Sequence, residues 1–337
     1  MLFPCLIVAL VLSVLGGILL GSAELTPETV WKVIRLKLFG ISNDALARSA
    51  ISIVWELRLP RVLMAITAGG GLAVAGAAMQ AVTQNVMADP YILGASGGAS
   101  AAVAFAFVIG GVFSRSAAII SVLAFLGAML ALLLVYSVGM VGNAGSTSRL
   151  VLAGMAISVI LTAATQFFIS IAPDTYTVRN ITAWTMGSLS GARWNTIGFP
   201  CIASVLGSLF FLLTARAFNL LSQGEETAIG LGLNVKLLKR WTIVVVSFIT
   251  GAVVAVGGVI GFVGFIIPHV VRFLFGADHR KVFPFSYLIG GLFLVWMDVI
   301  SRTIISPKEL PVGIFTAFCG GPFFIWLLYR KNRHGRI

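Results

Sequence analysis

The chain has 337 residues, of which 59% are hydrophobic and only 10% carry a charged side chain. Soluble globular proteins carry about a quarter of charged residues, so this composition excludes a soluble fold and predicts a membrane protein. The net charge of +12 does not indicate nucleic-acid binding, because the basic residues lie between apolar stretches. Anionic lipid and acidic protein partners are expected instead.

The predicted membrane-spanning segments are the stretches without Asp, Glu, Lys or Arg, since a spanning helix needs about 20 apolar residues. These stretches are 1–23, 62–88, 90–114, 116–148, 150–173, 195–215, 241–271, 282–297 and 310–329. The stretch 241–271 is too long for one helix across a bilayer, and its glycines at 257, 258, 261 and 264 predict a break. The sequence therefore predicts an all-α polytopic membrane protein with about ten transmembrane helices, in a single domain of residues 1–337.

The two ends of the chain indicate its orientation. Stretch 1–23 lacks a basic segment and an Ala-x-Ala cleavage site, so we expect a first spanning helix rather than a signal peptide. Ten helices place both termini on one side of the membrane. The tail is basic and by the positive-inside rule is cytoplasmic, with Arg330, Lys331, Arg333 and Arg336.

Two hydrophilic segments lie between the predicted spans. Segment 24–61 is too polar to span, and its part 26–39 predicts a surface helix outside the membrane. In the cytoplasmic segment 216–240, Ser222 and Glu225 match a capping box that opens a short helix ended by Gly230 and Gly232. A second short helix is predicted over 235–240. Two short helices indicate a docking surface for a partner, and a solvated loop is the alternative.

The sequence lacks the motifs that are typical of nucleotide binding, metal binding and hydrolysis. There is no Gly-x-x-x-x-Gly-Lys-Ser/Thr phosphate loop, no His-Glu-x-x-His and no paired-cysteine metal motif. We therefore expect no catalytic residue and no metal site. Ion-coupled carriers place Asp, Glu or Lys within the membrane, and only Asp298, at a helix end, is a candidate here. A partner ATPase is the expected energy source, with a secondary transporter as the alternative.

Motifs along nearly the whole chain resemble those of one family. The first is Arg58-Leu59-Pro60-Arg61, and residues 85–94 are similar to the signature Asn-Pro-Leu-Ala-Asp-Pro-x-Leu-Leu-Gly. Further motifs follow in the expected order at 146–154, 184–189, 261–272, 298–302, 309–314 and 321–324. Through them the chain resembles the FecCD-like permease family of type II ABC importers, which take up iron siderophores, haem and cobalamin.

This resemblance implies the ten-helix permease fold of a type II ABC importer and a transport subunit rather than an enzyme. The implied partners are a second permease copy or a paralogue, two ATPase subunits and an extracytoplasmic substrate-binding protein. The chain itself needs no cofactor, since ATP and Mg bind to the ATPase. The implied location is the bacterial cytoplasmic (inner) membrane. The implied cargo is a metal chelate, first a ferric siderophore and next haem or cobalamin.

The resemblance also implies roles for individual residues. The arginines that pair with acidic residues of the binding protein correspond to Arg58, Arg61 and Arg302, for which anchoring at lipid headgroups is the alternative. The cytoplasmic gate corresponds to Asn85, Met87, Thr147 and Ser148. Coupling to the ATPase corresponds to Glu226, Ala228, Gly230, Leu231 and Gly232. Val86 stands where the family has proline, so its backbone regains an N–H group and freedom in φ, and we expect a differently shaped gate turn.

Overall fold

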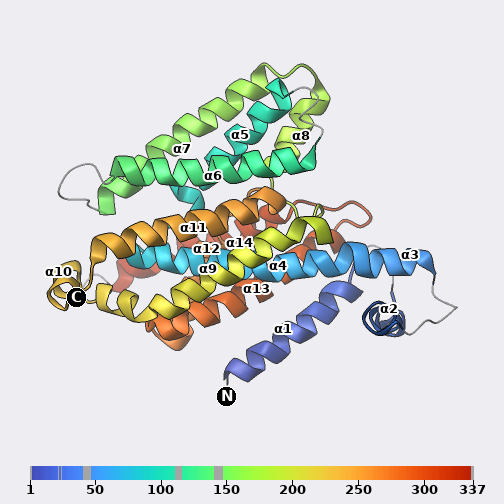
Figure 1. The fold of residues 1–337 in the computed structure, drawn as a ribbon, viewed down its shortest axis with the longest axis horizontal. Coiled ribbons are helices and arrows are strands. Elements are labelled where there is room, and N and C mark those ends of the chain that lie inside the picture. Colours follow the sequence, from blue (N-terminus) through green and yellow to red (C-terminus); the bar gives the residue numbers. More distant parts are fainter. Residues whose placement is uncertain are drawn as a thin grey trace.

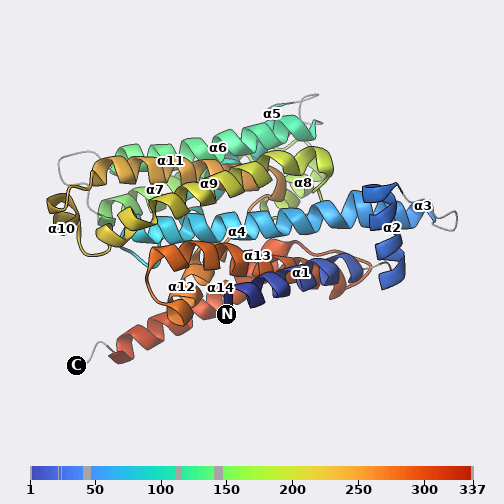
Figure 2. The same ribbon diagram turned by 60° about the horizontal axis from the view of Figure 1, so that its bottom comes forward.

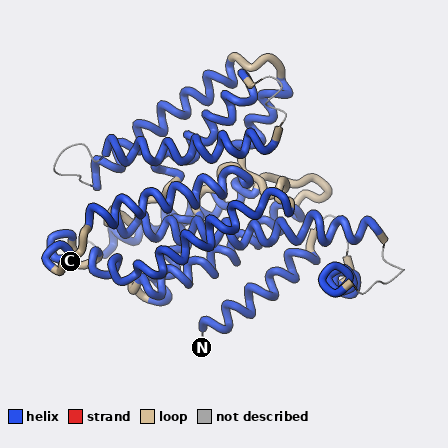
Figure 3. Tube along the Cα trace, in the orientation of Figure 1, coloured by secondary structure: helices blue, strands red, loops and turns tan. Residues whose placement is uncertain are grey.

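The structure is a computed structural model that describes residues 2–21, 23, 25–40, 47–110, 116–139 and 147–334. Within these ranges all regular secondary structure is helical (Figure 3), which confirms the predicted all-α fold. The elements are α1 (Leu2–Leu19), α2 (Pro27–Phe39), α3 (Arg48–Ile51), the π-helix η1 (Ser52–Arg58), α4 (Leu59–Val82), the π-helix η2 (Tyr91–Ala95), α5 (Ser96–Ile109), α6 (Ala117–Gly139), α7 (Thr147–Ser170), α8 (Thr175–Thr185), α9 (Trp194–Leu221), α10 (Glu225–Gly230), α11 (Val235–Gly257), α12 (Val263–Phe275), α13 (His279–Thr303) and α14 (Val312–His334).

The helices of the described residues are those of a multi-pass membrane protein. Six of them are long and apolar enough to cross a membrane: Arg48–Val82, Ala117–Gly139, Arg149–Ser170, Trp194–Leu221, Val235–Gly257 and His279–Thr303. Shorter apolar helices lie at Phe3–Leu19, Leu93–Ile109, Val263–Phe275 and Val312–Leu327. The break predicted within 241–271 is present, because α11 ends at Gly257 and α12 begins at Val263.

Helix α4 lies at the centre of the bundle, between α13 on one side and α9 and α11 on the other (Figures 1 and 2). Its glycines bring neighbouring backbones into contact. A Cβ at Gly69 would overlap the carbonyl group of Gly290 in α13, and a Cβ at Gly76 would overlap the backbone of Gly264 in α12. Small residues that permit such close approach are the usual means by which helices associate in lipid.

Helices α5, α6 and α7 form a second group that joins the rest through contacts between α6 and α11 (Figure 1). Gly98 of α5 and Gly127 of α6 meet at their backbones in the same way as the glycines of α4. The two ends of the molecule carry different short elements. Helices α2, α3 and α8 lie at one end, and α10 and the C-terminus lie at the other (Figure 1).

The hydrophilic segment 24–61 is only partly as predicted. Its surface helix is present as α2, whose N-cap Thr26 accepts a hydrogen bond from the backbone N–H of Thr29 at 3.2 Å. Residues 48–61 are helical rather than an irregular connection and continue into α4 as the helix Arg48–Val82, so Arg58 and Arg61 lie on the same helix as the predicted span 62–88. The 35 residues of this helix correspond to about 52 Å, which exceeds the hydrocarbon core of about 30 Å, so the place of 48–61 outside the membrane stays a prediction.

The segment 216–240 also differs from its prediction. Helix α9 continues to Leu221 and α11 begins at Val235, so the helix expected over 235–240 is the first part of α11. Helix α10 is present without the expected capping box. The hydroxyl of Ser222 donates to the carbonyl of Asn219 at 2.7 Å, because Ser222 still belongs to the last turn of α9, and Gly224 is the N-cap of α10.

The contact between α4 and α13 can be tested with Gly69→Ala. The added methyl group must push the two helices apart, and overpacking of this kind costs about 1–3 kcal/mol, so the melting temperature is expected to fall. The matched control is Gly198→Ala in α9, where a Cβ meets nothing within 4 Å. Equal melting temperatures for both variants in the same detergent would mean that the glycine contact is dispensable.

Candidate functional site

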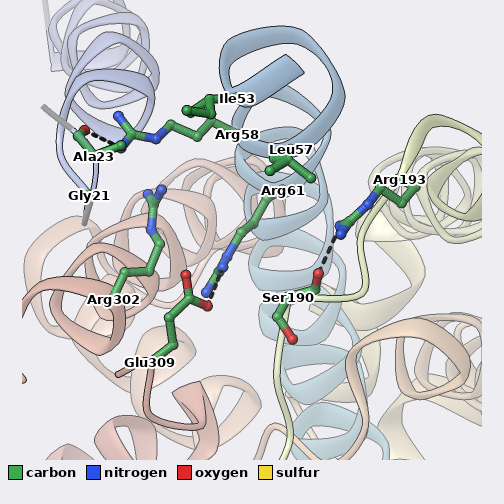
Figure 4. Close-up of a pocket in the computed structure, with 10 residues that line it drawn as sticks. All are labelled: Gly21, Ala23, Ile53, Leu57, Arg58, Arg61, Ser190, Arg193, Arg302 and Glu309. Atoms are coloured by element: carbon green, nitrogen blue, oxygen red, sulfur yellow. Dashed lines mark hydrogen bonds and ion pairs between the residues drawn. The ribbon is translucent and has the colours of Figure 1, made fainter. Parts of the chain in front are cut away.

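A pocket of about 340 Å³ lies at the end of the bundle that carries α2 and α3 (Figure 4). Segments far apart in the sequence meet around it. The lining residues are Gly21, Ala23, Ile53, Leu57, Arg58, Arg61, Ser190, Arg193, Arg302 and Glu309. Four of them are arginines and one is a glutamate, so this arginine pocket is strongly cationic.

Arg58, at the end of η1, holds the end of α1. Its Nη1 donates to the carbonyl oxygens of Ile18 and Leu19 at 2.7 and 2.8 Å, and its Nη2 donates to that of Ala23 at 2.6 Å. The last carbonyls of a helix lack partners within the helix and carry partial negative charge, so a guanidinium caps them well. Gly21 leaves room for this contact, since a Cβ there would lie 2.5 Å from Nη2 of Arg58.

A buried carboxylate joins Arg61 and Arg302. Asp298 of α13 is 1% exposed, and Nε of Arg61 donates to its two oxygens at 2.8 and 3.1 Å. Nε of Arg302 lies 3.2 Å from the second of these oxygens, and its Nη2 donates to the carbonyl of Gly17 in α1 at 2.8 Å. The carboxylate between two guanidinium groups keeps these charges paired, as a low-dielectric interior requires.

Two charged residues lie nearer the surface of the arginine pocket. Glu309, before α14, accepts a hydrogen bond from Nη1 of Arg61 at 2.7 Å, and its side chain is 37% exposed. Arg193, before α9, is exposed and donates to the carbonyls of Ser190 and Ala192 at 2.8 Å. Within the described ranges no carboxylate lies within 4 Å of its guanidinium. The rim therefore carries a positive charge that can attract an acidic group.

At the opposite end, the turn after α4 is bonded to the end of α9. Oδ1 of Asn85 accepts a hydrogen bond from the backbone N–H of Met87 at 3.0 Å and closes the turn. Nε2 of Gln84 donates to the carbonyl of Leu221 at 3.3 Å. Leu221 is the last residue of α9 before the loop to α10, so the predicted gate turn and the segment that carries α10 are directly linked.

Helix α10 packs one side on the bundle and turns the other outward. Ala228 is fully buried, whereas Ile229 and the C-cap residue Leu231 are 57% and 60% exposed. Glu225 accepts a hydrogen bond from Nζ of Lys239 in α11 at 2.6 Å. Gly232 follows with a φ of +85°, a left-handed conformation that favours glycine. A short, firmly held helix with exposed apolar side chains is suited to bind in a groove of a partner.

The end of α9 is also tied to the start of α13. Asn219 donates Nδ2 to Oδ1 of Asp278 at 2.6 Å and accepts a hydrogen bond from the backbone N–H of His279 at 2.8 Å. The Asn219 amide and the backbone N–H of Arg280 lower the pKa of the Asp278 carboxyl. The N-cap of α13 therefore stays charged, which suits the positive end of the helix dipole.

Comparison with known proteins places the chain among transport permeases. The FecCD transport family matches residues 6–330. The chain is 36% identical over 330 residues to the hemin transport system permease protein HmuU of Yersinia pestis, which covers 97% of this chain and 95% of that protein. It is 40% identical over 278 residues to the cobalamin import system permease protein BtuC of Halobacterium salinarum, and the match covers 82% of this chain and 73% of that protein. It is 35% identical over 333 residues to the iron(3+)-hydroxamate import system permease protein FhuB of Bacillus subtilis, with 97% and 83% covered.

The chain belongs to the FecCD transport family. Its fold agrees with this membership. A solved structure of a metal-chelate type ABC transporter in an inward-facing conformation matches with a TM-score of 0.82 at 27% identity, covering 96% of this chain and 97% of that one. These relatives are permease proteins of import systems, so this FecCD-family chain is a transport permease with the fold of an ABC importer permease.

In this FecCD permease the predicted site residues fall at two ends. Arg58, Arg61 and Arg302 share the arginine pocket, but they are 5%, 7% and 3% exposed and are already bonded within the chain. Their role toward a binding protein stays a prediction. Thr147 and Ser148 begin α7, but their side chains lie outside the described residues, so their place in the gate also stays a prediction.

Sequence reasoning misses the two other charged residues of the arginine pocket. Glu309 lies in one of the family-like motifs, which is the only signal that points to it. Arg193 has no such signal beyond its neighbour Trp194, whose Nε1 donates to the carbonyl of Trp55 at 2.8 Å and fixes the start of α9 against η1. Both residues reach the pocket only through the packing of distant segments.

Asp298→Asn is expected to destabilise the protein by about 3–5 kcal/mol, because it removes the charge that pairs Arg61 and Arg302 in a buried site. The measurements are the melting temperature and the folded fraction in gel filtration. The control is Glu56→Gln, which removes a carboxylate from an exposed position at the same end and is expected to change neither. Equal behaviour of the two variants would contradict the pairing role of Asp298.

Proposed function

We propose that this FecCD permease is the membrane-spanning subunit of an ABC importer for a metal chelate, delivered by an extracytoplasmic binding protein and driven by a partner ATPase. The observation that carries the proposal is a family permease fold with an arginine pocket at one end and an outward-facing α10 at the other. The chain supplies the passage, and the ATPase binds ATP and Mg.

The arginine pocket supports docking of an acidic binding protein. Arg193 at the rim attracts carboxylates, and the buried guanidinium groups behind it raise the local positive potential. A guanidinium binds a carboxylate through two parallel hydrogen bonds, which gives a directional and reversible contact. Both termini are cytoplasmic in this proposal, and the C-terminus lies at the α10 end, so the pocket is extracytoplasmic (Figure 1).

The α10 end supports coupling to the ATPase. The exposed side chains of Ile229 and Leu231 contact the ATPase. The buried Ala228 packs on the bundle, so a movement of α10 also displaces the helices against which it packs. The bond between Gln84 and the carbonyl of Leu221 joins this region to the gate turn of Asn85 and Met87. Movement of α10 as the ATPases close and open therefore reaches the gate.

A second permease copy or a paralogue covers part of the exposed apolar surface of this chain, which includes side chains of α1, α7, α9 and α14. Val159 and Ile160 of α7 are 69% and 66% exposed, and Phe318 and Ile325 of α14 are 73% and 68% exposed. The passage then runs between the two permeases, and lipid covers the remaining apolar surface. A second permease gene beside the gene of this chain would indicate a paralogue as the partner, and its absence would indicate a second identical copy.

The proposed cargo is a ferric siderophore, with haem and cobalamin next. The relatives are named for hemin, cobalamin and iron(3+)-hydroxamate, which share the chemistry of a bulky metal chelate. Selection among these chelates belongs to the binding protein, since the permease receives the cargo only after docking.

A secondary transporter is the second candidate, and it depends on Asp298. An ion-coupling carboxylate must bind and release its cation in every cycle. Asp298 is 1% exposed and is shared between Arg61 and Arg302, so a cation would have to displace two guanidinium groups. The importer is therefore the better-supported function.

The importer is tested with the complex of this chain and its genomically adjacent ATPase in lipid nanodiscs. ATP hydrolysis is expected to rise when the adjacent binding protein is added with one of three chelates: a ferric siderophore, haem or cobalamin. The chelate that gives the rise identifies the cargo. Absence of a co-purifying ATPase, together with solute uptake driven by an ion gradient, would overturn the proposal in favour of the carrier.

Docking in the arginine pocket is tested in the same assay with Arg193→Glu. A like charge placed against an acidic partner costs several kcal/mol, so affinity for the binding protein is expected to fall by about tenfold or more at low salt. The melting temperature is measured beside the affinity and is expected to fall only slightly, because the exposed Arg193 loses its two bonds to the carbonyls of Ser190 and Ala192. The control is Arg179→Glu, an exposed position of α8 outside the pocket. Arg58 and Arg61 are less suitable, because their substitution also disturbs helix packing.

Leu231→Asp tests the contact of α10 with the ATPase. A charge in place of an exposed apolar side chain is expected to reduce the amount of ATPase that co-purifies, since it weakens an apolar interface contact. Folding should be unaffected, because the side chain is 60% exposed. Leu231→Met keeps the apolar contact and should retain the ATPase. Equal retention by both variants would exclude Leu231 from the interface.

A further inference from the structure

The two carboxylates that hold Arg61 differ in how easily they can leave. Asp298 lies beneath the arginine pocket at 1% exposure and bonds Nε. Glu309 lies on the pocket wall, bonds Nη1 at 2.7 Å, and has a side chain that is 37% exposed (Figure 4). The guanidinium of Arg61 therefore has two carboxylate partners. Asp298 is shielded from solvent, whereas Glu309 is in contact with solvent.

The outer partner can be exchanged at small cost. A partly exposed ion pair contributes little to stability, because water and salt compete with it. Departure of Glu309 would not leave Arg61 as an unpaired buried charge, since Asp298 still holds its Nε. Arg61 and Glu309 both line the pocket, so an incoming carboxylate can take the position that Glu309 leaves and make the same bond to Nη1.

Glu309 is also placed on a segment that is held mainly through its backbone. It lies between α13 and α14, where the backbone N–H of Leu310 donates to the carbonyl of Ser301 at 2.9 Å and that of Lys308 donates to Ile305 at 2.9 Å. These bonds keep the segment in place whichever way the Glu309 side chain points. Release of the carboxylate therefore needs a side-chain rotation rather than a rearrangement of the loop.

We propose that Glu309 is an internal stand-in for the binding protein's carboxylate, and that docking exchanges one for the other on Nη1 of Arg61. This inference rests on the importer function and on docking at the arginine pocket. In the undocked permease, Glu309 lowers the positive potential of a pocket lined by four arginines. On docking, an acidic side chain of the partner takes its place and Glu309 turns to solvent.

The exchange makes Glu309 a specificity residue. A pocket lined by four arginines and without its own carboxylate would attract any small anion or acidic protein. With Glu309 in place, only a partner that brings a carboxylate to Nη1 and gains further contacts around the rim can compete. Discrimination by a competing group of this kind is a common way to suppress wrong partners.

The test is the affinity of the adjacent binding protein for the permease–ATPase complex in nanodiscs. Glu309→Gln and Glu309→Ala remove the competing charge and are expected to bind about fivefold more tightly at low salt, a gain that shrinks as salt is raised. The matched control is Glu56→Gln, which removes a charge at the same end outside the pocket and should bind as the unchanged protein does. Melting temperatures show which Glu309 variant is folded. The affinity of that variant for the binding protein then decides whether the exchange occurs.

The outcomes separate this inference from the function on which it rests. Tighter binding by a folded Glu309 variant, with Arg193→Glu binding more weakly, supports the exchange. Unchanged or weaker binding by the Glu309 variants, while Arg193→Glu still weakens it, overturns the exchange and leaves docking intact. A binding protein that does not respond to Arg193→Glu overturns docking at this pocket and the exchange with it.

Discussion

Backbone contact at the glycines of α4 is the constraint on which the rest of the structure depends. In lipid, apolar side chains gain little by leaving their surroundings, so helices associate through close packing and polar contacts. Gly69 meets α13 and Gly76 meets α12 without an intervening side chain. Because these contacts fix α4 along its length, they also fix what lies at its two ends.

The buried arginines at the pocket end are stabilised by shared hydrogen-bond acceptors within the protein rather than by contact with water. Arg58 and Arg302 donate to carbonyls near the end of α1, which has free acceptors there. Arg61 and Arg302 share Asp298, so three buried arginines need only one buried carboxylate. The same contacts that lock α1 to α4 and α13 thus maintain the positive potential that an acidic partner would meet.

Helix α4 connects the two candidate sites. Arg61 lies in its first turn, and the turn that contains Gln84 and Asn85 follows its last residue, Val82. Its 24 residues correspond to a rod of about 36 Å at the usual helical rise. A change in how Arg61 is held and a change in the loop before α10 therefore act on opposite ends of one stiff element. The connection between the two sites is spatial. In our proposal, the exchange of carboxylates on Arg61 is the event at the pocket end that would act on this helix first.

The sequence by itself determined the membrane class, the helical composition, the presence of a break within 241–271 and the family, because hydropathy and motifs are properties of neighbouring residues. Tertiary structure decided the ends of the helices and the partners of the charges. Ser222 had the right spacing for a cap, but packing of α9 kept it in the preceding helix. Arg61 finds Asp298 and Glu309 at separations of 237 and 248 residues. No local pattern encodes such a pairing, because it exists only when α4 and α13 have packed together.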